Sequence, residues 1–321
     1  MPRLIKKTVV LAKVETTSGT DATPTGAANA IQVMDLSITP LDLKMADLNT
    51  ITPWFGGMQK LATTASVKCS FSVLLAGAGV AATAPAWGAL LLGCAHAETT
   101  GLTTPARVEY LPATDLLKSL SIYWYDDGVL HKLLGAMGTV KLSAKSGEAP
   151  KLTFDFVGLD GGVAAVGNAA AVLTAWKTPP AVTKVNVTDI QLGCTYAAGV
   201  LTGGTSYNST GLELDWGNQV DFVPMLTTEQ VVLSDRNMTG RASLDLSAAQ
   251  EVSLMAQVKA NTAQGLGFVI GNTSGNKIML YAPAVQLLSP KKEELNGMRL
   301  IGFDLRLNPV LGNDELRIIS L

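Results

Sequence analysis

The chain has 321 residues, of which only 16% are Asp, Glu, Lys or Arg and 47% are apolar. An average globular chain carries about 25% charged residues. High hydropathy combined with 24 basic against 26 acidic residues excludes an intrinsically disordered chain and a polybasic nucleic-acid-binding protein. The apolar excess therefore belongs either in a membrane or in contacts between subunits.

The strongest candidate for a membrane span is the uncharged segment from Leu74 to Ala97. A spanning helix needs about 20 predominantly apolar residues without interruption. Several glycines and Pro85 interrupt this segment, so we expect no membrane span. The apolar run after Lys7 ends at Lys13, too soon for a signal peptide.

The chain has three cysteines, Cys69, Cys94 and Cys194, without a Cys-x-x-Cys spacing. An odd number cannot pair fully within one chain. We expect reduced, buried thiols in a protein that folds in a cytosolic compartment.

The pattern of the first half predicts an arm followed by strands. Residues 1–30 are assigned to an extended amino-terminal arm, because 15–30 are rich in Gly, Pro, Thr and Ala and lack a hydrophobic period. Alternating residues predict strands near 31–43 and 67–73. The connection between them, residues 44–61, contains Trp54 and Phe55, and its length indicates a functional loop.

A short helix and a hairpin are predicted next. Residues 84–95 combine Pro85 near the helix start with apolar residues at helical spacing. Residues 120–134 predict a hairpin that turns at Asp126, Asp127 and Gly128. Strands are predicted at 138–144 and 151–157.

The second half repeats this order of elements. Strands are predicted at 185–192, 241–246, 284–288 and 298–307, with a hairpin at 267–281 and a long loop at 215–237. Residues 247–259 predict a helix capped by Ser247.

The two halves also agree in register, which predicts an internal duplication. The hairpin glycines Gly128 and Gly275 lie 147 positions apart, and Asp155 lies 149 positions before Asp304. We therefore expect a mainly β (α+β) protein with one domain at 31–160, a linker at 161–181 and a duplicate domain at 182–321, each with one helix. The alternative is that unrelated β domains share short strands and turns.

The residue types needed for catalysis are sparse. His96 and His131 are the only histidines, and both are better explained as structural residues. The pairs Asp126–Asp127 and Glu293–Glu294 fit solvated turns better than paired catalytic carboxylates, and Gly77-Ala78-Gly79 matches a dinucleotide-binding pattern only loosely. We expect no enzyme activity, no cofactor and no metal.

Residues 10–16, 19–24 and 29–31 resemble the major tail tube proteins of long-tailed, siphovirus-type bacteriophages, particularly those of transposable phages. Residues 84–91 are similar to the segment that opens the helix in that family. The resemblance covers the first half directly and the second half only through the internal repeat.

This resemblance implies tandem β-sandwich domains whose inner sheets join around a ring into a barrel. The rings stack into a hollow tail tube, assembled in the host cytoplasm, through which DNA is ejected without specific binding. Implied partners are further copies of the chain and other tail proteins such as the tape measure, terminator and distal tail proteins, with no membrane. Such rings commonly hold six tube domains, so a duplicated chain favours three copies per ring. Six copies would apply if the second domain were merely decorative.

Two sets of residues are candidates for function in such a tube. Strand alternation places Asp155 opposite Phe154 and Phe156, and Asp304 opposite Phe303, so both aspartates are candidates for the lumen. An ordinary outward acid on a half-buried strand is the alternative. The candidate assembly residues lie in the arm and in the two long loops: Thr16, Pro24, Leu48, Trp54, Phe55, Trp216 and Phe222.

Two other functions are compatible with parts of the pattern. A secreted or surface-exposed adhesive β-sandwich would explain the strands, but it fits poorly with the absence of a signal peptide pattern and with the odd number of cysteines. An enzyme with an unrecognised site fits poorly with the scarcity of histidines and motifs.

Overall fold

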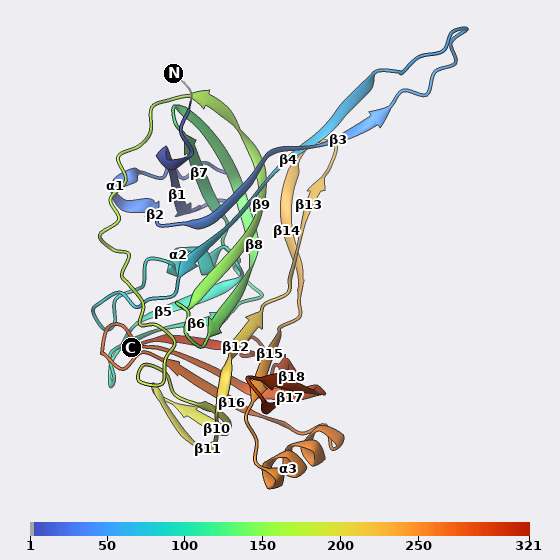
Figure 1. The fold of residues 1–321 in the computed structure, drawn as a ribbon. Helices are drawn as coiled ribbons and strands as arrows, with labels where there is room; N and C mark the ends of the chain where they lie inside the picture. The colour runs from blue at the N-terminus through green and yellow to red at the C-terminus, as the bar shows by residue number, and fades with distance from the viewer. Residues whose placement is uncertain (1–2) are drawn as a thin grey trace.

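The computed structural model describes residues 3–321 and is mainly β, with antiparallel strand pairs throughout (Figure 1). The first half begins with a short 3₁₀ turn (Ile5–Lys7) and has two short helices, α1 (Gly26–Asn29) and α2 (Gly88–Leu92). Its strands are β1 (Thr8–Val14), β2 (Ala30–Ile31), β3 (Met34–Asp47), β4 (Lys60–Leu74), β5 (His96–Leu102), β6 (Arg107–Pro112), β7 (Leu120–Asp126), β8 (Val129–Lys145) and β9 (Lys151–Ala165).

The second half has one helix, α3 (Ala248–Lys259). Its strands are β10 (Ile190–Ala197), β11 (Val200–Tyr207), β12 (Ser209–Asp215), β13 (Asn218–Pro224), β14 (Glu229–Arg236), β15 (Thr239–Leu244), β16 (Ala263–Ile270), β17 (Ile278–Leu295), β18 (Met298–Asn308) and β19 (Arg317–Ser320). The prediction of a mainly β fold is confirmed.

Both halves share one strand order. In the first half the hydrogen-bonded order is β2-β1-β7-β8-β9-β4-β3. In the second half it is β11-β10-β16-β17-β18-β15-β12. The order along the chain also corresponds, with α2 between β4 and β7 and α3 between β15 and β16. The hairpin β5–β6 and the strand β19 are the additions that differ between the halves, and β13–β14 takes the place of the outer part of the β3–β4 hairpin.

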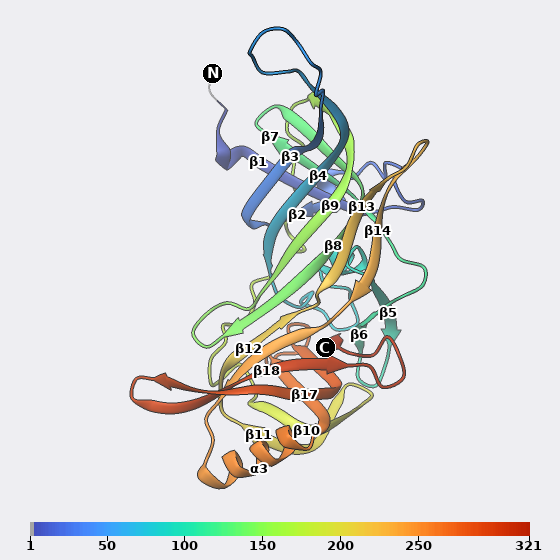
Figure 2. The same cartoon turned by 90° about the vertical axis from the view of Figure 1, so that its right-hand side faces the viewer.

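The two halves are joined into one continuous sheet because β12 pairs antiparallel with the end of β8. The resulting order is β3-β4-β9-β8-β12-β15-β18-β17, in which each half contributes four strands. Figure 2 shows this sheet running from the first half, at the top, to the second half, at the bottom. One face of it covers the core, which contains the fully buried Phe71, Phe154, Phe156 and Phe303.

Two further contacts fix how the halves meet. Strand β19 pairs with β6. The loop after β4 also touches the turn between β16 and β17, where Gly79 N–H donates to Gly275 O at 2.8 Å. A Cβ on Gly77 would lie 2.2 Å from Gly275 O, so glycine is needed there for the close approach.

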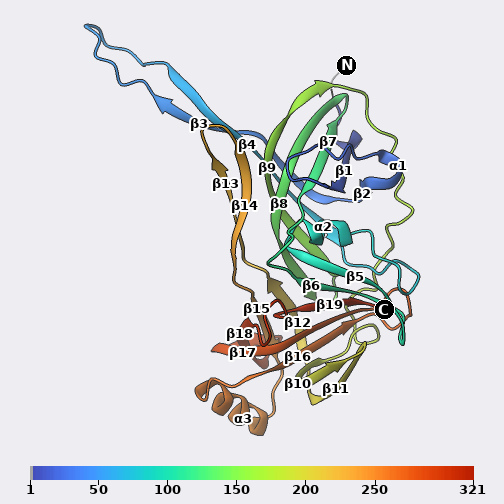
Figure 3. The same cartoon turned by 180° about the vertical axis from the view of Figure 1, so that it is seen from behind.

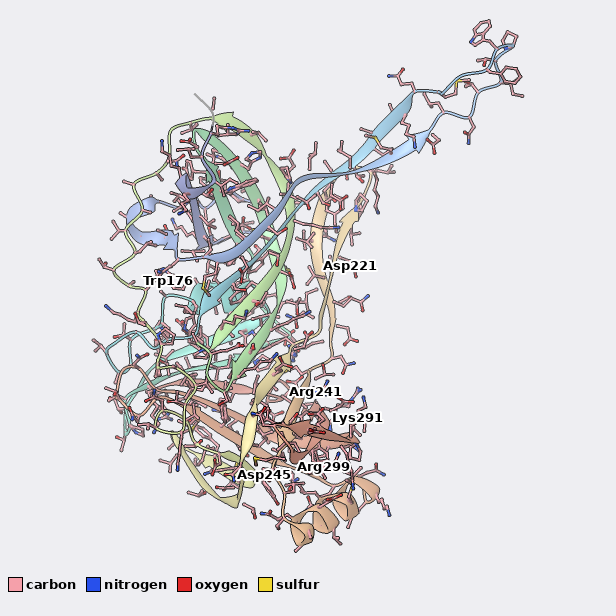
Figure 4. The ribbon with its side chains drawn as sticks, viewed as in Figure 1. Trp176, Asp221, Arg241, Asp245, Lys291 and Arg299 are labelled. Carbon is pink, nitrogen blue, oxygen red and sulfur yellow. The ribbon has the colours of Figure 1, made fainter. Side chains whose placement is uncertain are left out.

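Several predicted elements differ in the structure. Residues 215–237 were predicted as a loop but form the hairpin β13–β14. Within residues 3–321, its two strands pair only with each other, apart from the large sheet, and the hairpin lies over the first half. Residues 8–14 of the predicted arm form β1, which pairs along its length with β7. The pattern gave no prediction of β5, β6, β11, β12 or β19. The segment between β9 and β10 lies along the first half, where Trp176 Nε1 donates to Ala30 O at 2.9 Å (Figures 3 and 4).

The segment after β1 is held to the fold by the buried carboxylate of Glu15, whose residue is 3% exposed. It accepts hydrogen bonds from Ser119 Oγ at 2.7 Å, Ser121 Oγ at 2.7 Å, Gly19 N at 2.8 Å and Gly135 N at 2.9 Å. A buried carboxylate is tolerated only when its oxygens are fully hydrogen-bonded in this way. The predicted arm is therefore folded against the first half at this point.

Replacing Glu15 with Gln should lower the free energy of unfolding by about 3 kcal/mol, because the amide turns two donor hydrogens toward groups that are themselves donors. Urea denaturation followed by tryptophan fluorescence measures the change. Glu148→Gln, at an exposed position, is the control and should change stability by less than about 0.5 kcal/mol. Equal stabilities of the two variants would contradict the anchoring role of Glu15.

Candidate assembly surfaces

The seam between β8 and β12 shows how one half of the chain joins the other. Its register places Lys141 opposite Asp215 and Ser143 opposite Glu213. Ion pairs cross it, with Lys141 Nζ 3.4 Å from an Asp215 oxygen and Lys145 Nζ 2.6 Å from a Glu213 oxygen. These side chains are about half exposed, so the two ion pairs add little to the free energy of unfolding. They do favour this register of β8 and β12 over others.

The face of the eight-stranded sheet opposite the core is polar, and it is open except where the β13–β14 hairpin lies along β8 and β9. Asp155 and Asp304 both lie on it, since their neighbours Phe154, Phe156 and Phe303 are buried on the other face. Asp155 lies beside Lys68 in a shallow depression, and Asp304 is the register partner of Arg241. Further ion pairs join Lys68 to Asp42 and Arg241 to Glu293. The charges of this face are therefore largely balanced.

Each end of the eight-stranded sheet has a free edge. Within the described residues 3–321, β3 pairs along one side only, with β4. Residues 287–295 of β17 likewise pair only with β18. Exposed strand edges offer unpaired N–H and C=O groups to another chain. Figure 4 shows Lys291 and Arg299 at the free β17 end of the sheet.

The β3–β4 hairpin reaches far beyond the rest of the first half (Figure 1). Its tip, residues 48–59, is almost entirely exposed: Trp54 is 72% exposed, Phe55 108% and Leu48 43%. Isolated apolar residues on a surface are ordinary, but a projecting hairpin with several of them indicates a contact surface. Leu48, Trp54 and Phe55 are thus brought together in one place.

The other predicted assembly residues are placed differently. Thr16 is exposed, whereas Pro24 is buried against the first half. Phe222 is half-buried on β13. Trp216 is fully buried, so its surface is not available to a neighbouring copy. Its location is a correction to the predicted exposed loop.

Trp216 is buried because it inserts from the second half into the first. Its Nε1 donates to His96 Nε2 at 2.8 Å, and His96 Nδ1 lies 2.9 Å from Cys94 O. Since the indole N–H only donates, the imidazole must be neutral with its proton on Nδ1. Next to it, the Asn218 side-chain amide donates to Cys94 O at 3.1 Å and to Gly138 O at 3.0 Å.

A second joint between the halves is a buried ionic cluster on β6. Glu109 accepts a hydrogen bond from Arg107 Nε at 2.6 Å and pairs with Arg317 of β19, and it also accepts from the Tyr196 hydroxyl. Burial opposes its ionisation, but these donors outweigh it and hold the pKa of Glu109 below its usual range. The sequence predicted a structural role for His96 but not its partner Trp216, and it did not predict the Glu109 cluster, because Trp216, Tyr196 and Arg317 are far away in the sequence.

A family model described as phage tail tube protein matches residues 6–301. The chain belongs to the phage tail tube protein family. It is therefore a structural component of the phage tail, and membership implies self-assembly and association with other tail proteins. Among curated proteins, none matches the chain in sequence.

Membership in the tail tube family favours the tail tube interpretation over a secreted adhesive β-sandwich. Across residues 3–321 of this tail tube protein, no helix has the length and apolarity needed to cross a membrane. The same residues contain no group of three or more His, Cys, Asp or Glu side chains placed to hold a metal ion.

The His96 contact predicts a pH dependence of the tail tube protein's stability. Burial lowers the pKa of His96 to about 4, against 6.5 in the unfolded chain, so folding requires the neutral ring. No stability is lost above pH 6.5, and the loss grows as the pH falls toward 4. Between pH 7 and pH 5 this histidine should cost about 2 kcal/mol of unfolding free energy.

The variant His96→Gln keeps an acceptor for Trp216 but does not titrate, so its stability should fall less between pH 7 and pH 5. Urea denaturation at both pH values measures the difference. His131→Gln is the control: burial also lowers the pKa of His131, but this ring is far less buried, so the variant should retain the larger part of the loss. The same pH dependence in His96→Gln and the natural protein would contradict this assignment.

Proposed function

We propose that three copies of this chain form a ring, and that such rings stack into the hollow tube through which the phage genome is ejected. The observation that carries the proposal is the continuous eight-stranded sheet with a β8–β12 seam inside it and a free edge at each end. Repeating the seam between copies gives a closed barrel of 24 strands, eight from each copy. Each ring then holds six tube-like halves.

The strand registers specify the seam between copies. Asp155 and Asp304 occupy the same position in the two halves. When the cross-strand pairs are followed outward from them, Thr39 of β3 takes the position that Asp215 has in β12. In the same way, Lys291 of β17 takes the position that Lys141 has in β8. Asp215 and Lys141 are opposite each other at the internal seam. Thr39 of one copy therefore lies opposite Lys291 of the next in the proposed ring.

The other parts of the tube follow from this arrangement. The open face of the sheet, with Asp155 and Asp304, lines the lumen. The apolar tip of the β3–β4 hairpin, with Leu48, Trp54 and Phe55, contacts the neighbouring ring, as does the exposed loop around Thr16. The two ends of the tube bind other tail proteins, such as the tape measure, terminator and distal tail proteins. Assembly takes place in the host cytoplasm before the virion is complete.

The double variant Thr39→Cys, Lys291→Cys tests the ring. Both side chains are exposed, and directly opposed strand residues are close enough for a disulfide. Oxidation of assembled protein should give covalent dimers and trimers and no larger species, seen on non-reducing gels, and native mass spectrometry should count three chains per ring. Thr39→Cys with Lys118→Cys, also exposed, is the control and should not cross-link. Six chains per ring, or a ring without the disulfide, would contradict the proposal.

A second variant tests the lumen. Replacing both Asp155 and Asp304 with Lys should leave tubes that assemble, because both side chains point away from the core. Genome ejection should slow, since the added cations bind phosphate and release counterions. Ejection is followed by DNA-dye fluorescence after receptor triggering. Asp115→Lys with Asp189→Lys makes the same charge change at exposed positions outside the sheet and should eject at the natural rate. Equal rates for the two double variants would remove the lumen assignment.

A further inference from the structure

Two exposed surfaces of the chain have no partner within residues 3–321. One is the outer face of α3, where Ala249, Val252 and Ala256 recur at helical spacing and Val252 is 72% exposed. The other is the stem of the β3–β4 hairpin, residues 40–47 and 60–66, where Leu41 is 46% exposed, Met45 50% and Leu61 57%. The hairpin stem and the end of α3 each have an equivalent in the other half of the same chain that is covered.

The covered equivalent of the hairpin is β13–β14. Both hairpins leave the sheet at equivalent positions of the two halves. In the first half, the register of β3 shifts between Thr39 and Asp42. In the second half, the chain passes at the equivalent place from Asp215 in β12 to Asn218 in β13. Asp42 is thus the equivalent of Asn218. The β13–β14 hairpin lies along β8 and β9 of the other half, as Figures 1 and 3 show.

The covered equivalent of the end of α3 is the segment that follows α2. Both helices are followed by a residue with positive φ, Ala95 at 56° and Asn261 at 52°. Residues 94–96 are buried, in part under Trp216 and Asn218. Residues 260–262, at the equivalent place, are all exposed. The second half therefore lacks the cover that the first half receives.

One copy cannot supply this missing cover to itself. Strand β3 and strand β17 are opposite edges of the eight-stranded sheet, and Figure 1 shows the β3–β4 hairpin and α3 at opposite ends of the molecule. A second copy paired across the β3 and β17 edges brings its hairpin stem to α3.

We propose that the stem of the β3–β4 hairpin of one copy docks on the end and outer face of α3 of the next copy, as β13–β14 docks on the first half within the chain. This inference rests on the proposed ring and adds a second contact between its copies.

The chemistry of the two surfaces is complementary but differs from that of the internal contact. Asp42 has no donor to offer a carbonyl group, unlike Asn218. In the free chain its carboxylate pairs with Lys68 at 2.6 Å. In the docked ring the exposed Lys259 in the last turn of α3 becomes a second cationic partner, while Leu41 and Met45 cover the small apolar side chains of the helix. This contact buries apolar surface that the free chain exposes.

Chemical cross-linking tests the contact. In the variant Asp42→Cys, Ala260→Cys, a short bis-maleimide should link different copies within assembled rings. Asp42→Cys with Ser274→Cys, which is equally exposed but remote from α3, is the control and should link less than one tenth as efficiently. Rings of three with no excess of the first cross-link would overturn the docking while leaving the proposed function intact. A failure to form rings by unsubstituted protein would instead contradict the proposed function.

A substitution on α3 gives an independent test. Val252→Asp places a charge on the outer face of the helix, where the isolated chain has no contact to lose, so far-UV circular dichroism and the melting temperature should stay unchanged. Ring assembly, measured by analytical ultracentrifugation, should weaken at least tenfold. Val200→Asp, at a valine that is 51% exposed on another surface, is the control. Equal assembly by the two variants would overturn the docking.

Discussion

The pairing of β12 with β8 is the interaction on which the rest of the architecture depends. Without it, each half would be a separate sandwich with its own edges. With it, four strands from each half form one surface, apolar toward the core and polar on the open side. The same pairing leaves β3 and β17 as the only ends of that surface, so it determines where another copy can be added and in which direction.

Free edges of this kind expose a chain to unspecific pairing, and the sequence of β17 limits that risk. The edge segment contains Pro290, which lacks a backbone donor, followed by Lys291, Lys292, Glu293 and Glu294. Charges and proline on an edge disfavour pairing with arbitrary strands. A partner strand must instead match both the register shift and the charge pattern, which restricts pairing to a strand such as β3.

The local sequence pattern was sufficient to predict strands that bury one face within their own half. It was insufficient to predict segments that are buried by contact with the other half of the chain. Alternation around Asp155 and Asp304 placed both aspartates correctly on the face away from the core. The helix at 247–259 followed from its capping residue, and Ser247 indeed accepts from Gln250 N. The hairpin β13–β14 has no strong period because it contacts a distant surface, and the burial of Trp216 depends on His96, 120 residues away. The β8–β12 seam involves the same long-range pairing, so no local pattern contains it.

The contact between Gly77 and Gly275 has a consequence for the geometry of a closed assembly. Together with the β6–β19 pairing, it sets the angle between the two halves of a copy. In a closed ring, the angles between the two halves of each copy and between neighbouring copies must add up to one full turn. A change of angle at the Gly77–Gly275 contact occurs in every copy, so its effect on ring closure is multiplied. In the proposed ring, a side chain at Gly77 would push the halves apart, and the changed angle would prevent the ring from closing. In the proposed ring, the absence of side chains at Gly77 and Gly275 thereby controls the diameter of the bore.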